Sequence, residues 1–297
     1  MGSFIPRSLH IAATVKVNQI IWIRSLPSDD EGLSRRITHD LEDLSADEGG
    51  LPLRQIAVGH RQAFEAELDR IATEASASAR PIIHFDCHGS PTKGLRLAPS
   101  GDFVPWDALA EKLRQIDVAT GNNLCCFFAA CFGLHIALEF DLSLPSPFFL
   151  AIGPEGKIEL GYLEDRTVPF YRSVNESKNI GRSHLKVLAP EMQLFHCKEI
   201  LAKGLATYIN QYGRGKILAQ RRERVVSRGL EKRGIKNPTS ADLREARSRS
   251  KSLRVTQRTI DHYAKTFLLG RKAGFGITEL KELAAGMRRS GSPRNLR

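Results

Sequence analysis

The 297-residue sequence contains no apolar run of the roughly 18 residues that a membrane-spanning helix needs. Its first residues, MGSFIPRSLHIAATVKV, lack the apolar segment and the cleavage site of a secretory leader. Cysteine is scarce, and the five residues are an odd number that does not suit a disulfide framework. We therefore expect a cytoplasmic protein with free thiols and no membrane span.

The spacing of cysteine and histidine does not match the common metal sites. No Cys-x2-Cys pair is present, although structural zinc sites favour such paired ligands. His84, Cys87 and His88 carry suitable atoms, but along one strand the two histidines face one way and the cysteine the other. We therefore expect no metal and no other cofactor. Convincing zinc-finger, RNP and helix-turn-helix patterns are also lacking, and so is any internal repeat.

Basic residues are unevenly distributed along the chain. Residues 1–200 hold 20 basic and 26 acidic side chains, a net charge of −6, whereas residues 201–297 hold 24 and 7, a net charge of +17. Such an asymmetry indicates a separate segment with its own role. We expect residues 201–297 to be an accessory recognition segment for nucleic acid or another acidic partner. A solvated basic face and contact with an anionic membrane surface are the alternatives.

The hydrophobic content of 41% supports a buried core, and the length suits one α/β domain with a smaller appendage. Short apolar runs alternate with segments whose apolar residues have helical spacing. Predicted strands cover residues 18–26, 51–59, 81–85, 124–130 and 147–152, and predicted helices cover residues 32–44, 60–73, 104–116, 134–138 and 157–174. This alternation predicts a doubly wound, mostly parallel sheet with the first strand at its centre. A small hairpin is expected over residues 95–104.

The last third of the chain has a different character. Residues 192–212 have a helical, half-apolar pattern, and Pro238–Asp242 has the composition of a turn and a helix N-cap. A loop and a short helix are expected over residues 268–286. We therefore divide the chain into an α/β domain over residues 1–180, a basic and mostly helical region over residues 181–290, and a disordered tail over residues 291–297.

Two of the predicted strands end in a reactive side chain close to glycine. His88 is followed by Gly89, and Cys131 is followed by Phe132 and Gly133. A right-handed crossover through the intervening helix makes the two strands parallel, so both end at the same edge of the sheet. We therefore expect His88 and Cys131 to be neighbours. An adjacent imidazole helps a cysteine to react at neutral pH, because only the thiolate attacks.

The residues around this pair suggest further roles. Gly89 permits a tight backbone turn, and its N–H together with that of Cys131 is the candidate oxyanion hole. The helix expected at residues 134–138 places Cys131 near a helix N-terminus, which favours a thiolate. Asp86 lies two residues before His88 and could orient the imidazole only if the strand ends between them.

The motif HFDCHG, followed by Ala129-Ala130-Cys131-Phe132-Gly133, resembles the caspase-like cysteine peptidases, most closely their bacterial CHAT-type branch. The resemblance covers roughly residues 20–173, about half of the chain. It implies a caspase-like three-layer α/β/α fold and a His-Cys dyad, with His88 and Cys131 at the matching positions. Caspases proper have Gln-Ala-Cys-Arg-Gly at the nucleophile, so their specificity for aspartate does not carry over. The resemblance also suggests a role in bacterial defence or regulated cell death.

Acidic residues follow the strand that comes after the nucleophile, where specificity pockets of such folds are commonly built. Glu155 and Asp165, near Glu159 and Glu164, would select Lys or Arg before the scissile bond. Acidic residues near a helix N-terminus also have a simpler explanation, because they stabilise the helix dipole. We take Glu155, Asp165 and Asp86 as the substrate-binding candidates.

These observations predict a cysteine endopeptidase that acts on protein or peptide substrates, with His88, Cys131 and Gly89 as its catalytic residues. Two alternatives stand beside it. The chain could be a catalytically inactive scaffold with the same fold, in which His88 and Cys131 are unrelated core residues. It could instead be a nucleic-acid-binding protein that acts through the basic C-terminal region.

Overall fold

The structure is a computed structural model that describes residues 15–98, 100–212, 215–235, 237–249 and 255–289. These residues form two compact units, divided between Cys197 and Lys198. The sheet-containing unit thus extends beyond the boundary predicted at residue 180. It does so because a helix and an edge strand after that residue still pack on the sheet. The predicted tail over residues 291–297 lies outside the described residues.

The first unit is an α/β structure with a mostly parallel sheet, as the sequence predicts. Its strands are β1 (Gln19–Ser25), β2 (Leu53–Ala57), β3 (Pro81–Ser90), β4 (Gly94–Arg96), β5 (Phe103–Val104), β6 (Cys125–Ala129), β7 (Leu150–Gly153) and β8 (Gln193–His196). Their order is β2-β1-β3-β6-β7-β8, and β7 pairs with β8 in the antiparallel direction. The central positions belong to β3 and β6, so the expectation that the first strand is central is wrong.

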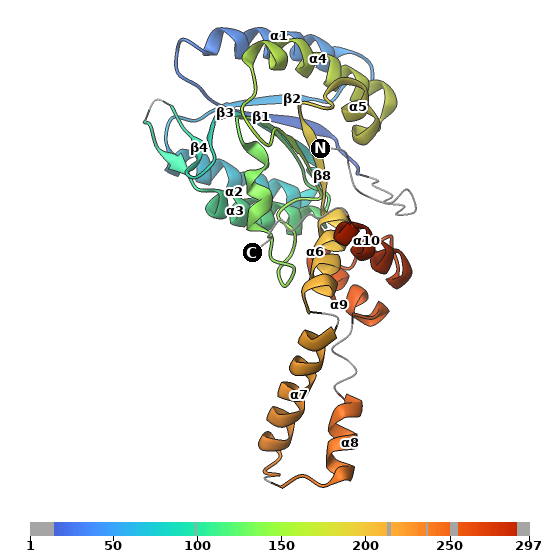
Figure 1. Ribbon diagram of the computed structural model, residues 1–297. Coiled ribbons are helices and arrows are strands. Elements are labelled where there is room, and N and C mark those ends of the chain that lie inside the picture. Colours follow the sequence, from blue (N-terminus) through green and yellow to red (C-terminus); the bar gives the residue numbers. More distant parts are fainter. Residues whose placement is uncertain (1–14, 99, 213–214, 236, 250–254, 290–297) are drawn as a thin grey trace. The chain divides into compact units, whose positions relative to one another are not determined.

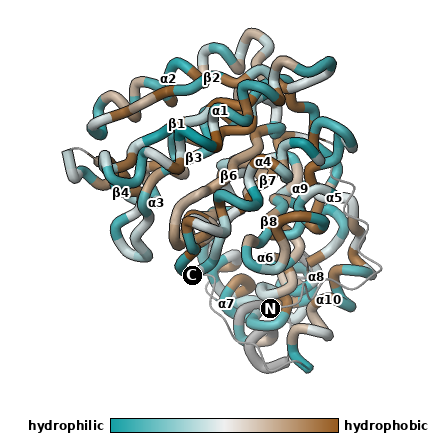
Figure 2. Tube along the Cα trace, turned by 90° about the horizontal axis from the view of Figure 1, so that it is seen from above, coloured by the Kyte–Doolittle hydropathy of each residue, from teal (hydrophilic) through white to brown (hydrophobic). Residues whose placement is uncertain are grey.

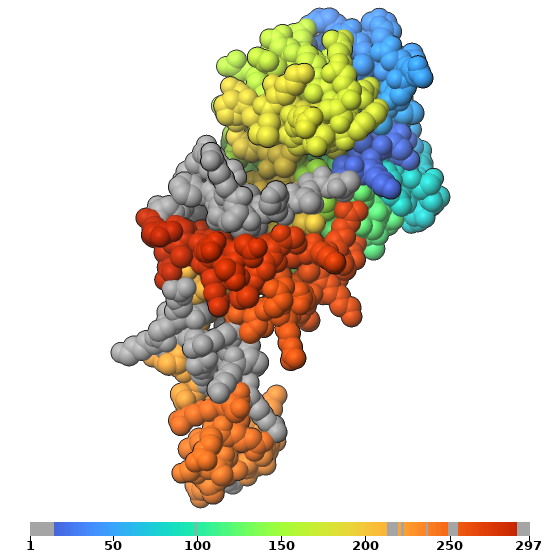
Figure 3. Space-filling model, turned by 90° about the vertical axis from the view of Figure 1, so that its right-hand side faces the viewer, coloured from blue at the N-terminus to red at the C-terminus, as the bar shows by residue number. Residues whose placement is uncertain are grey.

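The helices lie in two layers on opposite faces of this sheet (Figure 1). They are α1 (Glu31–Ala46), α2 (Arg61–Ala77), α3 (Trp106–Thr120), α4 (Leu160–Ser177) and α5 (Ile180–Val187), with a 3-10 helix η1 over Gly133–Glu139. One face carries α2 and α3, and the other carries α1, α4 and α5. The space-filling view shows α4 and α5, in yellow-green, side by side on the surface of the layer that also contains α1 (Figure 3).

The alternation of side chains along β3 and β6 divides the core between the two faces. Phe85 and Phe128 are fully buried and belong to the core under α2 and α3. His84 and Phe127 point to the opposite face, where the His84 imidazole stacks on Phe127 and bonds to Tyr171 of α4. The run CCFFA of β6 is coloured as apolar throughout (Figure 2), as expected for a strand that is covered on both faces.

The predicted hairpin is confirmed. β4 pairs with the end of β3, and β5 pairs with β4, both in the antiparallel direction. The register places His88 opposite Arg96 and Gly89 opposite Leu95. As a result, β3 continues past the parallel sheet to Ser90 and does not end at His88.

The second unit is helical over its described residues. Its helices are α6 (Cys197–Tyr212), α7 (Gly215–Lys232), α8 (Ser240–Arg249), α9 (Gln257–Phe267) and α10 (Ile277–Arg289). The helix predicted over residues 192–212 is correct only from Cys197 on, because Gln193–His196 forms strand β8. None of the described helices is both long and apolar enough to cross a membrane.

Candidate active site

His88 and Cys131 extend two neighbouring central strands in matching positions. β3 and β6 pair in parallel register up to Asp86 and Ala129. His88 is two residues past Asp86, and Cys131 is two residues past Ala129. Because paired parallel strands advance equally per residue, both side chains leave the sheet at the same level. The structure therefore brings the predicted pair to one edge of the sheet.

The contacts of the two side chains place them on the same face of the sheet. His88 Nε2 lies 3.1 Å from Oδ2 of Asp30, the residue that precedes α1. Cys131 Sγ lies 3.5 Å from the N–H nitrogen of Ile158, two residues before α4. Helices α1 and α4 belong to one layer, where an ion pair joins Arg36 to Glu164. The imidazole and the thiol thus both point to the layer of α1 and α4.

Gly89 lies directly against the backbone of Cys131. A Cβ atom at this position would stand 1.8 Å from the carbonyl oxygen of Cys131 and 3.0 Å from its carbonyl carbon. No side chain fits at that distance, so glycine is required here for close approach and not for a turn. This contact fixes the spacing between the end of β3 and the segment after β6.

Cys131 is held by a loop that returns from β7. The Phe132 N–H donates to Gly156 O at 2.7 Å, and the Leu134 N–H donates to Pro154 O at 3.2 Å. Phe132 has a positive φ of 60°, which is uncommon for a bulky residue and is held here by those contacts. The resulting bend presents Cys131 just before η1, so the helix predicted at residues 134–138 is present as a 3-10 helix.

The thiol of Cys131 has a main-chain partner that can stabilise its charged form. The Ile158 N–H points to Sγ at 3.5 Å, and the Ile158 carbonyl oxygen lies 3.8 Å from the same sulfur. A thiol can donate to that carbonyl, whereas a thiolate can accept from the N–H. Cys131 is half-buried, which leaves room for a substrate to reach it.

The other thiols of the chain are not placed to react. Cys87, Cys125, Cys126 and Cys197 are all buried. Burial raises the pKa of the Cys87 thiol, and the nearby Asp86 carboxyl adds to this effect. Burial also raises the pKa of Cys126. Since only the thiolate is nucleophilic, Cys131 is the cysteine that the structure leaves available for chemistry.

Asp86 does not take the substrate-binding place that the sequence suggested. It is 8% exposed, and its Oδ2 accepts hydrogen bonds from the Trp22 Nε1–H and from the hydroxyl of Ser34. Burial raises the pKa of this carboxyl, while the two hydrogen bonds act in the opposite direction. Because β3 runs through Asp86 and His88 without a break, the condition under which Asp86 would orient the imidazole is not met, although the charges of the two groups interact. Its role is to tie β3 to β1 and α1.

Glu155 and Asp165, the other two acidic candidates, are exposed. Glu155 belongs to the loop that holds Cys131, next to Gly156. Its N–H donates to Gln193 Oε1 at 3.2 Å. Asp165 lies further along, in the second turn of α4. Its neighbour Glu164 is engaged by Arg36.

Asp30 is a site residue that the sequence reasoning missed. Its segment, Pro27-Ser28-Asp29-Asp30, has the composition of a turn that stops a strand. The signal that could have identified it is positional, because Asp30 follows β1, the strand next to β3. The strand order reverses between β1 and β3, and open α/β sheets bind ligands at such a switch point.

No group of three or more His, Cys, Asp or Glu side chains is arranged for a metal ion within the described ranges. In comparisons with known proteins, no protein-family model and no curated protein matches this chain. The functional assignment therefore depends on the residues and contacts described above.

Proposed function

We propose that this protein is a cysteine endopeptidase of the caspase-like type, in which His88 and Cys131 act as a dyad. The observation that carries this proposal is the matched exit of the two residues from paired strands, with Gly89 pressed against the Cys131 backbone. A strand-ending histidine or a half-buried cysteine alone would have little weight. Their shared level, their shared face and the close backbone contact together favour a catalytic arrangement over two unrelated core residues.

In the proposed reaction the Cys131 thiolate attacks the carbonyl carbon of a peptide bond and forms a tetrahedral oxyanion. The Gly89 and Cys131 N–H groups serve as its donors. His88 then gives a proton to the leaving amine as the C–N bond breaks, which leaves a thioester on Cys131. His88 next takes a proton from a water molecule, whose oxygen attacks the thioester. The acid product leaves and the thiol is restored.

The finer proposal is cleavage after Lys or Arg. Glu155 supports it because it is exposed and precedes Gly156, whose carbonyl accepts from the N–H of Phe132, the residue after Cys131. Asp165 is a weaker candidate because it stands a full turn into α4. Glu155→Gln should therefore lower kcat/KM for Lys and Arg substrates more than Asp165→Asn does. If both variants change kcat/KM equally for all substrates, Glu155 does not form an acidic pocket that selects Lys or Arg.

The nucleophile can be tested on the full-length chain in two ways. Iodoacetamide applied to the native protein should modify Cys131 first, read by mass spectrometry, because the other four cysteines are buried. A peptide library that varies the residue before the scissile bond should be cleaved by wild type and not by Cys131→Ala. Cleavage that survives in Cys131→Ala would reject the nucleophile, and equal labelling of Cys131 and Cys197 would argue against its activation.

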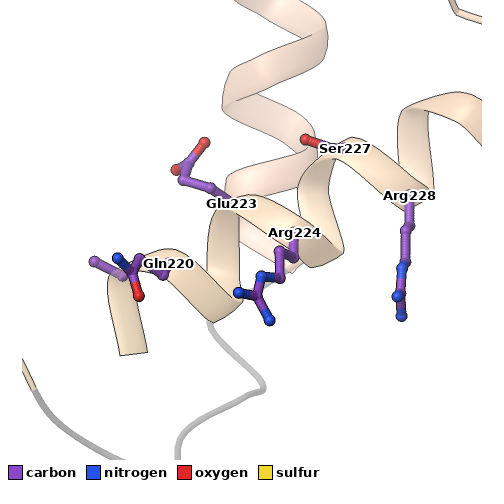
Figure 4. Close-up of a pocket in the computed structure, with 6 residues that line it drawn as sticks. Gln220, Glu223, Arg224, Ser227 and Arg228 are labelled. Atoms are coloured by element: carbon purple, nitrogen blue, oxygen red, sulfur yellow. The ribbon is translucent and has the colours of Figure 1, made fainter. Parts of the chain in front are cut away.

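A second candidate function is nucleic-acid binding by helices α7 and α8. The segment from residue 215 to 249 contains 11 basic and 4 acidic residues. An open hollow on α7 is lined by Ala219, Gln220, Glu223, Arg224, Ser227 and Arg228. Arg224 and Arg228 extend from the helix in the same direction, whereas Glu223 points away from them (Figure 4). Glu223 is also paired with Arg247 of α8, so it does not offset the two arginines.

This second candidate predicts binding that depends strongly on salt. Labelled single-stranded and duplex oligonucleotides of mixed sequence should bind the full chain, and log K should fall linearly with log salt. Arg224→Gln with Arg228→Gln should reduce that slope by about 2 if each arginine contacts one phosphate. A matched double variant, Lys265→Gln with Lys281→Gln, removes two exposed charges from α9 and α10. Equal slopes of log K against log salt for the two double variants would exclude a specific role of Arg224 and Arg228.

A further inference from the structure

Asp30 occupies a helix N-cap but does not cap the helix. It precedes α1, and aspartate at that position normally accepts a hydrogen bond from the N–H two or three residues on. The Asp30 side chain makes no such bond. Its backbone has φ −94° and ψ −13°, in the helical region and not in the extended region that suits a cap. The carboxylate of Asp30 therefore remains available for a partner outside α1.

That partner is His88. Asp30 Oδ2 lies 3.1 Å from His88 Nε2, with side chains that are 28% and 40% exposed. An N-cap bond stabilises a helix by about 1 kcal/mol, which α1 forgoes at its first turn. Proteins often give up such local stability at functional sites, where a side chain is used for chemistry and not for the stability of its own helix.

Asp86, on the same strand, interacts with the charge of His88 but has other hydrogen-bond partners. Asp86 lies two residues before His88, but its Oδ2 is occupied by Trp22 and Ser34 in the core. Among the acidic residues in the described ranges, Asp30 makes the ion-pair contact with this imidazole. Asp30 lies between β1 and α1, and the strand order reverses between β1 and β3.

The contact determines which ring nitrogen carries the proton. An ionised carboxylate only accepts hydrogen bonds, so the Nε2 of a neutral His88 must be the donor. The proton then sits on Nε2, and the lone pair is on Nδ1. Nδ1 becomes the nitrogen that exchanges protons with Cys131, the leaving amine and the water. The carboxylate also stabilises the imidazolium that forms during the reaction.

We propose that Asp30 is a positioning residue that completes an Asp-His-Cys arrangement by fixing the tautomer and the direction of the His88 ring. This inference rests on the proposed function, since its catalytic consequence needs the dyad. Its structural half, the control of the His88 tautomer, can be measured without any substrate. The nearby Asp29 is a built-in comparison, because its carboxylate accepts from the Ser28 hydroxyl at 3.3 Å and is exposed.

The experiment compares Asp30→Asn, Asp30→Ser and Asp30→Glu with wild type and with Asp29→Asn, all as full-length chains. An amide at position 30 can donate to Nε2, which favours the Nδ1–H tautomer and blocks the base. Serine is a good N-cap residue, so it removes the carboxylate while it keeps the start of α1. Two-bond ¹H–¹⁵N spectra of the histidine rings, with His88 assigned from His88→Asn, report the tautomer.

We expect the Nε2–H tautomer in wild type and in Asp29→Asn, and a shift toward Nδ1–H in Asp30→Asn. The value of kcat should fall about 10- to 100-fold in Asp30→Asn, with KM within about threefold, and should recover in part in Asp30→Glu. An unchanged His88 tautomer in both Asp30→Asn and Asp30→Ser would overturn the inference, as would equal losses of kcat in Asp29→Asn. If wild type cleaves no peptide, the proposed function fails, whereas the role of Asp30 is judged from the spectra.

Discussion

The two histidines of β3 lie on the same strand but in different surroundings. His84 and His88 are four residues apart and point to the same face of the sheet. His84 is fully buried, stacked between Trp22 and Phe127, and burial lowers its pKa well below the usual value. His88 is 40% exposed and contacts Asp30. One strand thus carries a fully buried histidine at its middle and a partly exposed histidine near its end.

The largest effect is expected when the exposed histidine is replaced. His88→Asn should lower peptidase kcat/KM by about 100-fold or more, because the base and acid of the reaction are lost. Its free energy of unfolding should stay within about 0.5 kcal/mol of wild type, because the side chain is outside the core. Peptide hydrolysis and denaturant unfolding measure the two quantities. The control is His39→Asn, which replaces an exposed histidine on α1. Equal activity of the two variants would contradict a catalytic role of His88.

A loss of similar size but different origin is expected at Gly89. Gly89→Ala forces main-chain atoms apart, since the new Cβ would stand 1.8 Å from Cys131 O. Displacement of the nucleophile by about 1 Å can reduce the rate by about 100-fold. A fall in melting temperature should accompany it, unlike in His88→Asn. The control is Gly161→Ala in α4, where no atom lies within 4 Å of the new Cβ. It should leave the rate unchanged and should leave the melting temperature unchanged or raise it slightly.

The buried histidine should show the opposite pattern. His84→Leu should lower the free energy of unfolding by about 2 kcal/mol, because it removes the two ring stacks and leaves the Tyr171 hydroxyl unpaired. Peptidase activity per folded molecule should change by less than about threefold. Urea titrations at one pH, together with hydrolysis assays, would test this. Loss of activity without loss of stability would mean that His84, too, belongs to the site.

The same variant should change the pH dependence of stability. The folded pKa of His84 is depressed, so the unfolded chain binds more protons once the pH falls below about 6.5. Wild-type stability should therefore decrease as the pH is lowered from about 7, and part of that slope should disappear in His84→Leu. The buried His184, whose pKa burial also lowers, contributes in both proteins and cancels in the difference. Identical slopes in the two proteins would contradict the buried neutral state of His84.

The sequence predicts part of this fold and of the candidate site. The apolar runs, the helical spacing and the glycine after His88 were enough to predict the parallel strands and the convergence of His88 with Cys131. The pattern of Gln193–His196 does not distinguish a strand from a helix, because four residues are too few to separate the two periods. Only the pairing with β7, a non-local contact, makes them a strand.

Long-range contacts also explain the errors at the site. Closeness to His88 in the chain makes Asp86 a site candidate, but its hydrogen-bond partners Trp22 and Ser34 come from β1 and α1. Asp30 was overlooked because an aspartate at the start of a helix has an ordinary explanation as a cap. Its contact with His88 spans two strands and depends on the strand order, which no local pattern contains.

The smallest effect is expected at Asp86, which joins the two regions compared above. Asp86→Asn keeps an oxygen for Trp22 and Ser34, so kcat/KM should fall by less than about threefold, and stability at pH 7 by about 1 kcal/mol. Burial raises the Asp86 pKa, so the protonated carboxyl is favoured in the fold, and its contribution to stability is lost as the pH rises through that pKa. The difference in stability between wild type and Asp86→Asn should therefore be larger near pH 3.5 than at pH 7. A loss of activity as large as that of His88→Asn would instead restore Asp86 to the substrate-binding site.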